Sequence, residues 1–192
     1  DRTTGRELFP SEWKQMTRAT LEGEVAADSQ RFPVLPPPFA RQQLTVFDDG
    51  GRALRRYDVS SSKNGAGEHK GSYCTPRGRH VVRAKIGKGQ PVNTVFVRRR
   101  PTGEIYTPAL GERFPERDWI LTRILWLSGC EPGVNRLGQV DTMQRYIYIH
   151  GSPESVDVGK PGSIGCIRMR NDDLLELFDL VAPGTPVEIV ES

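Results

Sequence analysis

Residues 146–169, YIYIHGSPESVDVGKPGSIGCIRM, contain the pattern that decides the fold of this chain. The stretch opens with strict alternation, which is typical of a half-buried β-strand and places Tyr146, Tyr148 and His150 on one face and Ile147 and Ile149 on the other. A segment rich in Gly, Pro and Ser follows, as expected of a loop. Cys166 comes after a Ser-x-Gly turn, and Arg168 follows two residues later. The pattern predicts a strand, a returning loop and a second extended segment.

Cys166 and His150 are candidates for a nucleophile and its base. A thiol becomes a strong nucleophile when a base takes its proton, and histidine is the usual partner. The loop between them is long enough to fold back and bring thiol to imidazole. The adjacent glycines, Gly151 and Gly165, let backbone amides approach a reacting carbonyl closely. Spacing alone leaves a second interpretation open, in which both are core residues without a catalytic part.

The surrounding sequence predicts a β-rich domain with one C-terminal helix. Twenty glycines and fifteen prolines indicate many turns. Two alternating runs flank a Gly-Gly turn and predict a hairpin. After Cys166, Asn171 can cap a helix with its apolar residues on one face. The expected strands lie at 42–49, 53–62, 75–87, 91–100, 117–127 and 185–191, and the run at 117–127 also fits a short helix.

Residues 1–40 differ from the rest of the chain. Ser11 can cap a helix whose apolar positions, beginning with Trp13, fall roughly on one face. The run PVLPPPF that follows favours an extended linker. We therefore expect an N-terminal helix and Pro-rich strap at 1–40 and a main domain at 41–192. The strap either packs on the domain without another role or frames its cleft.

Composition excludes several classes of protein. The net charge of +3 is small for a nucleic-acid-binding protein, and no nucleic-acid-binding module is evident. No C-x-x-C pair occurs, so a zinc site is not expected. Cys74 and Cys130 could form a disulfide or remain thiols.

No apolar run is long enough for a transmembrane helix. The chain begins with Asp, so an export signal could precede it.

The motif H-G, a gap, then S-x-G-C-I-R-M, with T-P-x-G upstream at 75–78, resembles that of the YkuD-type L,D-transpeptidases. These are bacterial cell-wall enzymes with a cysteine nucleophile. The resemblance covers about residues 42–190 and involves several constrained residues at fixed spacing. It implies a mainly β fold, a YkuD-like sandwich of mixed sheets with a C-terminal helix packed on it. The helical N-terminal extension would add to that catalytic domain.

The resemblance also implies roles for individual residues. Cys166 would be acylated, and His150 would be its base. A backbone carbonyl just after the histidine would orient the imidazole, which points to Gly151 or Ser152. The oxyanion hole would come from the backbone amides of Gly165 and Cys166.

Three further residues are expected to shape the substrate site. Ser163 would shape the turn before the nucleophile, and Tyr148 would line the cleft beside His150. Arg168 stands where the family has a residue near the substrate. The two parallel N–H donors of its guanidinium suit a carboxylate of a meso-diaminopimelate stem peptide. The alternative role for Arg168 is a structural ion pair.

One position departs from the family pattern. The family usually has a histidine between the Ser and Gly of the motif, and this chain has Ile164. Either that histidine is dispensable or another group compensates. His80 is the candidate for compensation, and the alternative is a strand histidine without a catalytic part.

Residues 79–123 contain ten Lys and Arg against four Asp and Glu, centred on the run Arg98–Arg100. Such a segment either attracts the carboxylates of stem peptides or forms an ordinary solvated face.

We therefore predict an enzyme that cross-links peptidoglycan stem peptides in the periplasm or cell envelope, without a cofactor. The cross-link would join two diaminopimelate residues, although D-amino acids or a lipoprotein lysine could also be acceptors. Water as acceptor would make the same site an L,D-carboxypeptidase. A non-catalytic peptidoglycan-binding domain is a further alternative. Carbapenem β-lactams are the expected inhibitors, because the family forms acyl-enzymes with them.

Overall fold

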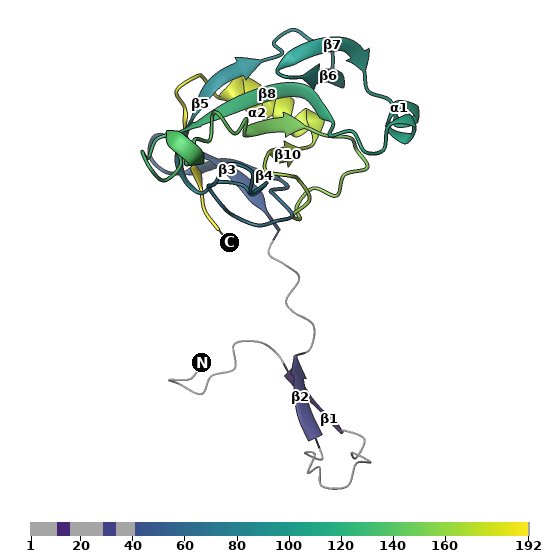
Figure 1. Ribbon diagram of the computed structural model, residues 1–192, viewed down its shortest axis with the longest axis vertical. Helices are drawn as coiled ribbons and strands as arrows, with labels where there is room; N and C mark the ends of the chain where they lie inside the picture. Colours follow the sequence, from purple (N-terminus) through teal and green to yellow (C-terminus); the bar gives the residue numbers. More distant parts are fainter. Residues whose placement is uncertain (1–10, 16–28, 34–40, 192) are drawn as a thin grey trace. The chain divides into compact units, whose positions relative to one another are not determined.

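The structure is a computed structural model and describes residues 11–15, 29–33 and 41–191. The chain divides into two compact units, Asp1–Ala40 and Arg41–Ser192. In the first unit, β1 (Ser11–Gln15) pairs antiparallel with β2 (Ser29–Pro33) (Figure 1).

The predicted N-terminal helix is therefore wrong at its start, because Ser11–Gln15 is a strand. Paired strands satisfy each other's backbone groups, whereas a short helix without a packed face is only marginally stable. The other positions of that predicted helix, and the proline run after Pro33, lie outside the described residues.

A seven-stranded mixed sheet forms the centre of the second unit, with the path β10-β9-β8-β5-β11; β6 pairs with β8, and β7 pairs with β6. All pairs are antiparallel except β9 with β10, which is parallel. Parallel neighbours need a crossover connection, which the loop between them supplies. The strands are β5 (Gly78–Ile86), β6 (Thr94–Val97), β7 (Arg100–Ile105), β8 (Ile120–Gly129), β9 (Tyr148–Gly151), β10 (Ile167–Met169) and β11 (Pro186–Ile189).

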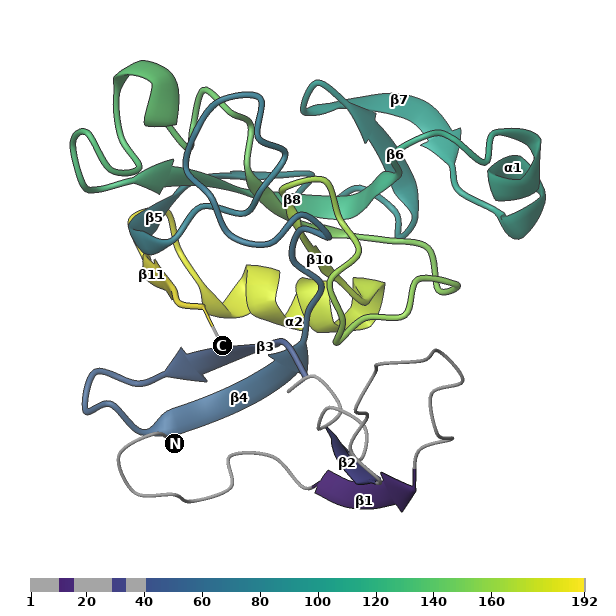
Figure 2. The ribbon, with the colours of Figure 1, turned by 60° about the horizontal axis from the view of Figure 1, so that its bottom comes forward.

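The predicted hairpin and C-terminal helix are confirmed. Strands β3 (Gln43–Phe47) and β4 (Ala53–Asp58) pair antiparallel across the Gly-Gly turn. Helix α2 (Asn171–Leu180) runs across the unit between the large sheet and this hairpin (Figure 2). A short helix, α1 (Pro108–Arg113), and a 3-10 turn, Gly138–Val140, complete the elements. The mainly β fold with mixed sheets and one main helix is thus confirmed.

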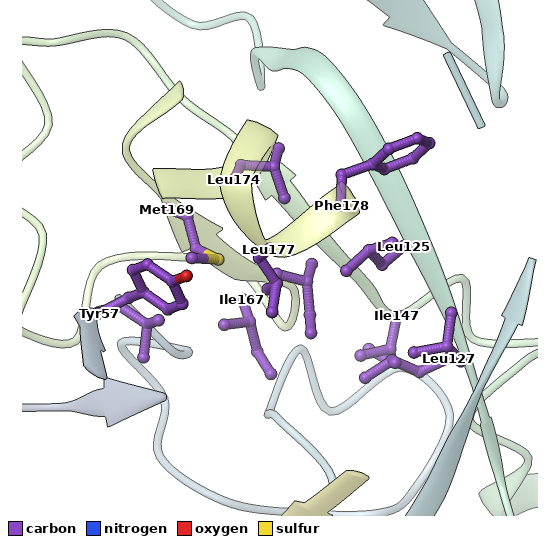
Figure 3. Packing of buried hydrophobic residues seen from close by; sticks show 12 residues of the cluster. Tyr57, Leu125, Leu127, Ile147, Ile167, Met169, Leu174, Leu177 and Phe178 are labelled. Atoms are coloured by element: carbon purple, nitrogen blue, oxygen red, sulfur yellow. The ribbon is translucent and has the colours of Figure 1, made fainter. Parts of the chain in front are cut away.

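The main core lies where α2 meets the large sheet. Leu174, Leu177 and Phe178 of the helix pack against apolar side chains of β8 and β9 (Figure 3). The run at 117–127, for which strand and helix were both open, is a strand from Ile120 onward, with buried residues on both faces. This explains its nearly continuous apolar pattern.

Alternation along β9 separates this core from a second side of the sheet. Ile147 and Ile149 belong to the main core, as the sequence predicts. Tyr148 belongs to a different buried cluster, against which Cys166 packs. Tyr146 lies outside the strand, is exposed and has a positive φ of 59°. The side of the sheet that carries Tyr148 therefore carries the candidate nucleophile.

Truncation of Leu174 tests whether α2 closes the main core. Leu174 is fully buried, so Leu174→Ala should lower the free energy of unfolding by about 2–5 kcal/mol through lost contacts and a residual cavity. Leu180→Ala, on the exposed side of the same helix, should change it by less than about 0.5 kcal/mol. Urea denaturation measures both, and equal losses would contradict this packing.

Candidate active site

Parallel pairing of β9 and β10 places the two candidate residues on the same face of the sheet, where the Cys166 thiol and His150 Nε2 make no hydrogen bond with each other. Arg168 lies opposite His150 in the register, and Ile167 lies opposite Ile149. Cys166 precedes β10 and, by alternation, shares the face of Arg168. The thiol is therefore presented on the side of the sheet that carries His150 and Tyr148.

The turn before Cys166 is fixed by side-chain hydrogen bonds. Ser163 Oγ accepts a hydrogen bond from the Gly165 N–H at 3.1 Å and donates one to the Cys166 carbonyl. The Thr75 hydroxyl, from the upstream T-P-x-G motif, donates to the Gly165 carbonyl at 2.9 Å. Gly165 has a φ of 131°, a conformation that other residues rarely adopt. The two sequence motifs thus meet at one turn.

The two amides of the expected oxyanion hole are not equivalent. The Gly165 N–H is engaged by Ser163, as described above. The Cys166 N–H has no hydrogen-bond acceptor in the described part of the chain. In this state, Cys166 therefore supplies the amide that is free to meet a developing negative charge.

The Cys166 thiol is held in its neutral form. Burial raises its pKa to about 12, and the backbone N–H of Tyr148 is the largest influence that lowers it. The thiol donates to the Tyr146 carbonyl, with Sγ and O separated by 3.5 Å. The negative charge of Asp118 also raises the pKa. A base must therefore remove the proton before this sulfur can attack.

His150 has the environment of such a base. The side chain is fully buried, and its Nδ1 lies 2.8 Å from the Gly151 carbonyl oxygen. Since a carbonyl can only accept, Nδ1 carries the hydrogen of the neutral ring. Nε2 has no hydrogen-bond partner among the described residues. Burial lowers the pKa of His150 while Asp118 raises it, so the resting ring is neutral with a free lone pair at Nε2.

Buried polar side chains hold the chain after His150 in place. Ser152 donates to the Met169 carbonyl at 3.0 Å, and its own carbonyl accepts from Asn171 Nδ2 at 3.1 Å. Thr122 donates to Asn171 Oδ1. A side chain at Gly151 would collide with Asn171 Oδ1, so only glycine fits there. The cap position of α2 is Arg170 rather than Asn171, because the Asn171 side chain is committed to this network.

A cleft of about 410 Å³ opens at Cys166. Tyr148 lines it, with its hydroxyl accepting from Arg99 at 3.0 Å. The other lining residues come from several loops and strands: Tyr73, Arg98, Arg99, Asp118, Ile120, Arg145, Tyr146, Ile147 and Ile164.

Arg168 makes an ion pair rather than facing this cleft. Its Nη2 lies 2.8 Å from Asp118 Oδ1, and its Nη1 donates to the Gly162 carbonyl at 3.0 Å. Arg168 lines a neighbouring pocket of about 510 Å³ instead. The structural ion pair, which the sequence left open as an alternative, is present; recognition of a carboxylate stays a prediction.

His80 lies away from the cleft. Its ring is buried, with Nδ1 2.9 Å from the Gly78 carbonyl and Nε2 3.0 Å from the Thr142 hydroxyl. Both ring nitrogens are thus occupied, and His80 is not among the residues lining the cleft. The side chain of Ile164 lines the cleft and is 45% exposed.

Sequence reasoning missed Asp118 and Arg145. Asp118 influences both Cys166 and His150, and nothing in its local sequence signals this. Arg145 donates to the carbonyls of Gly67, Glu68 and Cys74 and so ties an otherwise irregular loop to the cleft. The ion pair of Asp118 with Arg168 and the hydrogen bonds of Arg145 each link segments that are far apart in the sequence.

The described residues hold no cluster of side chains suited to a metal ion, and no described helix is long and apolar enough to cross a membrane. All three cysteines are free, so Cys74 and Cys130 form no disulfide in this structure.

Comparison with curated proteins identifies similar chains. The probable L,D-transpeptidase ErfK/SrfK of Salmonella typhimurium is 47% identical over 133 residues, 62% of this chain and 40% of that protein. The probable L,D-transpeptidase YbiS of Escherichia coli is 29% identical over 136 residues, 62% of this chain and 41% of that protein. This chain therefore spans about two fifths of the length of these relatives.

The matches among solved structures include an L,D-transpeptidase from Mycobacterium smegmatis. It has a TM-score of 0.40 and 23% identity, and the match covers 74% of this chain and 51% of that one. The family model for the L,D-transpeptidase catalytic domain, YkuD, matches residues 39–189, which include the hairpin, the large sheet and the Cys166 cleft. The chain belongs to the YkuD family of L,D-transpeptidase catalytic domains.

Proposed function

We propose that this chain is a peptidoglycan L,D-transpeptidase that works through a Cys166 acyl-enzyme. The observation that carries the proposal is a neutral, half-buried thiol on the same face of the sheet as a buried imidazole whose Nε2 has no partner among the described residues. Membership of the family supports acyl transfer between stem peptides as the reaction. Its site of action would be the cell envelope, where peptidoglycan lies.

The first step transfers the acyl group to the enzyme. His150 Nε2 takes the thiol proton as Cys166 Sγ attacks the carbonyl of residue 3 of a tetrapeptide stem. The Cys166 N–H donates to the oxyanion that forms, and His150 returns the proton to the departing amine of D-alanine. Gly151 serves by holding the Nδ1–H, which keeps the lone pair on Nε2.

The second step transfers the acyl group to an acceptor. A diaminopimelate amine of another stem attacks the thioester, His150 takes its proton, and the Cys166 thiol is regenerated with the new amide bond. The cross-link is then of the 3-3 type. A carbapenem offers the same thiol a strained carbonyl and should acylate Cys166.

Removal of either catalytic group tests the assignment. Cys166→Ala should abolish release of D-alanine from a disaccharide tetrapeptide, and His150→Ala should lower the rate about 10²–10⁴-fold. Cys130→Ala and His69→Ala, outside the lining of the cleft, are matched controls that should retain activity. Mass spectrometry of the products distinguishes a dimer from the tripeptide that a carboxypeptidase would give. Normal turnover by folded Cys166→Ala would refute the proposal.

The pH dependence of alkylation tests the neutral resting thiol. Because the pKa of Cys166 is raised to about 12, the thiolate fraction should grow about tenfold per pH unit throughout the neutral range. Labelling of Cys166 by iodoacetamide should therefore rise from pH 6 to pH 9 without a plateau. Peptide mapping measures the rate at this residue. A plateau already reached at pH 7 would indicate a thiolate–imidazolium pair instead.

Arg168→Lys separates an ion-pair role from recognition of a substrate carboxylate. Lysine keeps the charge but loses the fork that contacts Asp118 and the Gly162 carbonyl together. We expect a lower melting temperature with near-normal turnover in the folded protein. Unchanged melting temperature with a strong loss of turnover would instead assign Arg168 to the substrate.

A further inference from the structure

The arginines that line the Cys166 cleft differ in the hydrogen-bond partners that they already have within the protein. Arg145 is bound to three backbone carbonyls, and Arg99 to the hydroxyl of Tyr148. Arg98 is exposed and makes no hydrogen bond or ion pair with the described residues. The cleft's carboxylate, Asp118, is already paired with Arg168. Arg98 is thus the lining cation that stays available to a ligand.

Arg98 occupies an unusual backbone position. It stands with Arg99 at the two-residue turn between β6 and β7, where Val97 pairs with Arg100. The φ angles are 49° at Arg98 and 66° at Arg99, in the left-handed region that such turns normally fill with Asn and Gly. Two long side chains at these positions carry a conformational cost. Nothing in the hairpin itself requires arginine there.

Neighbouring contacts fix this turn beside the cleft. The Arg99 guanidinium lies 4.4 Å from the ring centre of Trp126 and 4.9 Å from that of Tyr146. Strand β6 also pairs with β8, which anchors the hairpin to the large sheet (Figure 1). Arg99 therefore holds the tip of the turn, while the Arg98 side chain is left to line the cleft.

We propose that Arg98 binds a carboxylate of the donor stem peptide in the Cys166 cleft. The inference rests on the proposed function and assigns the anion-binding group that the sequence suggested at Arg168. A guanidinium recognises a carboxylate through two parallel hydrogen bonds. Exposed apolar side chains of Tyr73, Tyr146 and Ile164 share the lining, so a bound peptide would shield this contact from water.

The donor stem carries three free carboxylates, and singly amidated substrates distinguish them. One tetrapeptide carries an amide in place of the terminal D-alanine carboxylate, a second in place of the diaminopimelate carboxylate and a third in place of the glutamate carboxylate. With the wild-type protein, kcat/KM should fall only for the substrate whose amide replaces the carboxylate that Arg98 binds.

Variants of the turn separate charge from backbone strain. Arg98→Asn removes the charge with a residue that tolerates the left-handed conformation. This variant should lower kcat/KM about tenfold or more for the tetrapeptide with all its carboxylates. It should lower kcat/KM much less for the tetrapeptide whose amide replaces the carboxylate that Arg98 binds. Arg100→Asn, at an exposed position outside the cleft lining, is the control and should be normal. Equal losses by Arg98→Asn on acid and amide substrates, or no loss, would overturn the inference.

Alkylation of Cys166 supplies a readout that does not depend on peptidoglycan chemistry. Iodoacetate carries a carboxylate and iodoacetamide does not, so their rate ratio reports attraction of an anion to the cleft. Arg98→Asn should lower this ratio at Cys166 about threefold, and Arg100→Asn should leave it near the wild-type value. If the wild-type protein is inactive on stem peptides but Arg98→Asn still lowers the rate ratio at Cys166, the proposed function alone is refuted. An unchanged ratio would overturn the role of Arg98.

Discussion

The parallel pairing of β9 with β10 is the constraint on which the site depends. These strands carry His150 and, immediately before β10, Cys166, and their register brings both to one side of the sheet. Slipping the register by one residue would turn the thiol toward the main core. The packing of Ile149 and Ile167 in that core opposes such a slip, so the burial that stabilises the fold also aligns the reacting groups.

Burial then sets the protonation states. Desolvation raises the pKa of Cys166 and lowers that of His150, so both groups rest uncharged. A resting thiolate–imidazolium pair would cost desolvation free energy in this position. Proton transfer during the attack creates charge only while the new bond forms. The free Nε2 is one of two buried polar side-chain atoms without a partner in the described structure, and an unfilled lone pair is what a base requires.

The arginines in and beside the cleft divide into three that are held by contacts within the protein and one that is available to a ligand. Arg145 closes a loop onto the cleft, Arg99 locks the β6–β7 turn against aromatic rings, and Arg168 is paired with Asp118. Only tertiary contacts distinguish them from Arg98, since all four are arginines in ordinary strand or loop sequence. Their net effect is a cleft whose single carboxylate is neutralised and whose available charge is positive.

The sequence by itself determined most of the strands, the C-terminal helix and the two candidate catalytic residues, because alternation and motif spacing are local properties. It predicted one strand over 91–100, where the structure turns at Arg98–Arg99 and continues as β7. It predicted a helix at Ser11, where a strand pairs with a distant one, because local periodicity carries no information about a pairing partner. Tertiary structure alone decided that Asp118 engages Arg168, that both nitrogens of His80 are occupied away from the cleft, and that Arg98 has no polar partner among the described residues. Each outcome depends on which distant segments meet, and the energy of such contacts exists only after the chain has folded.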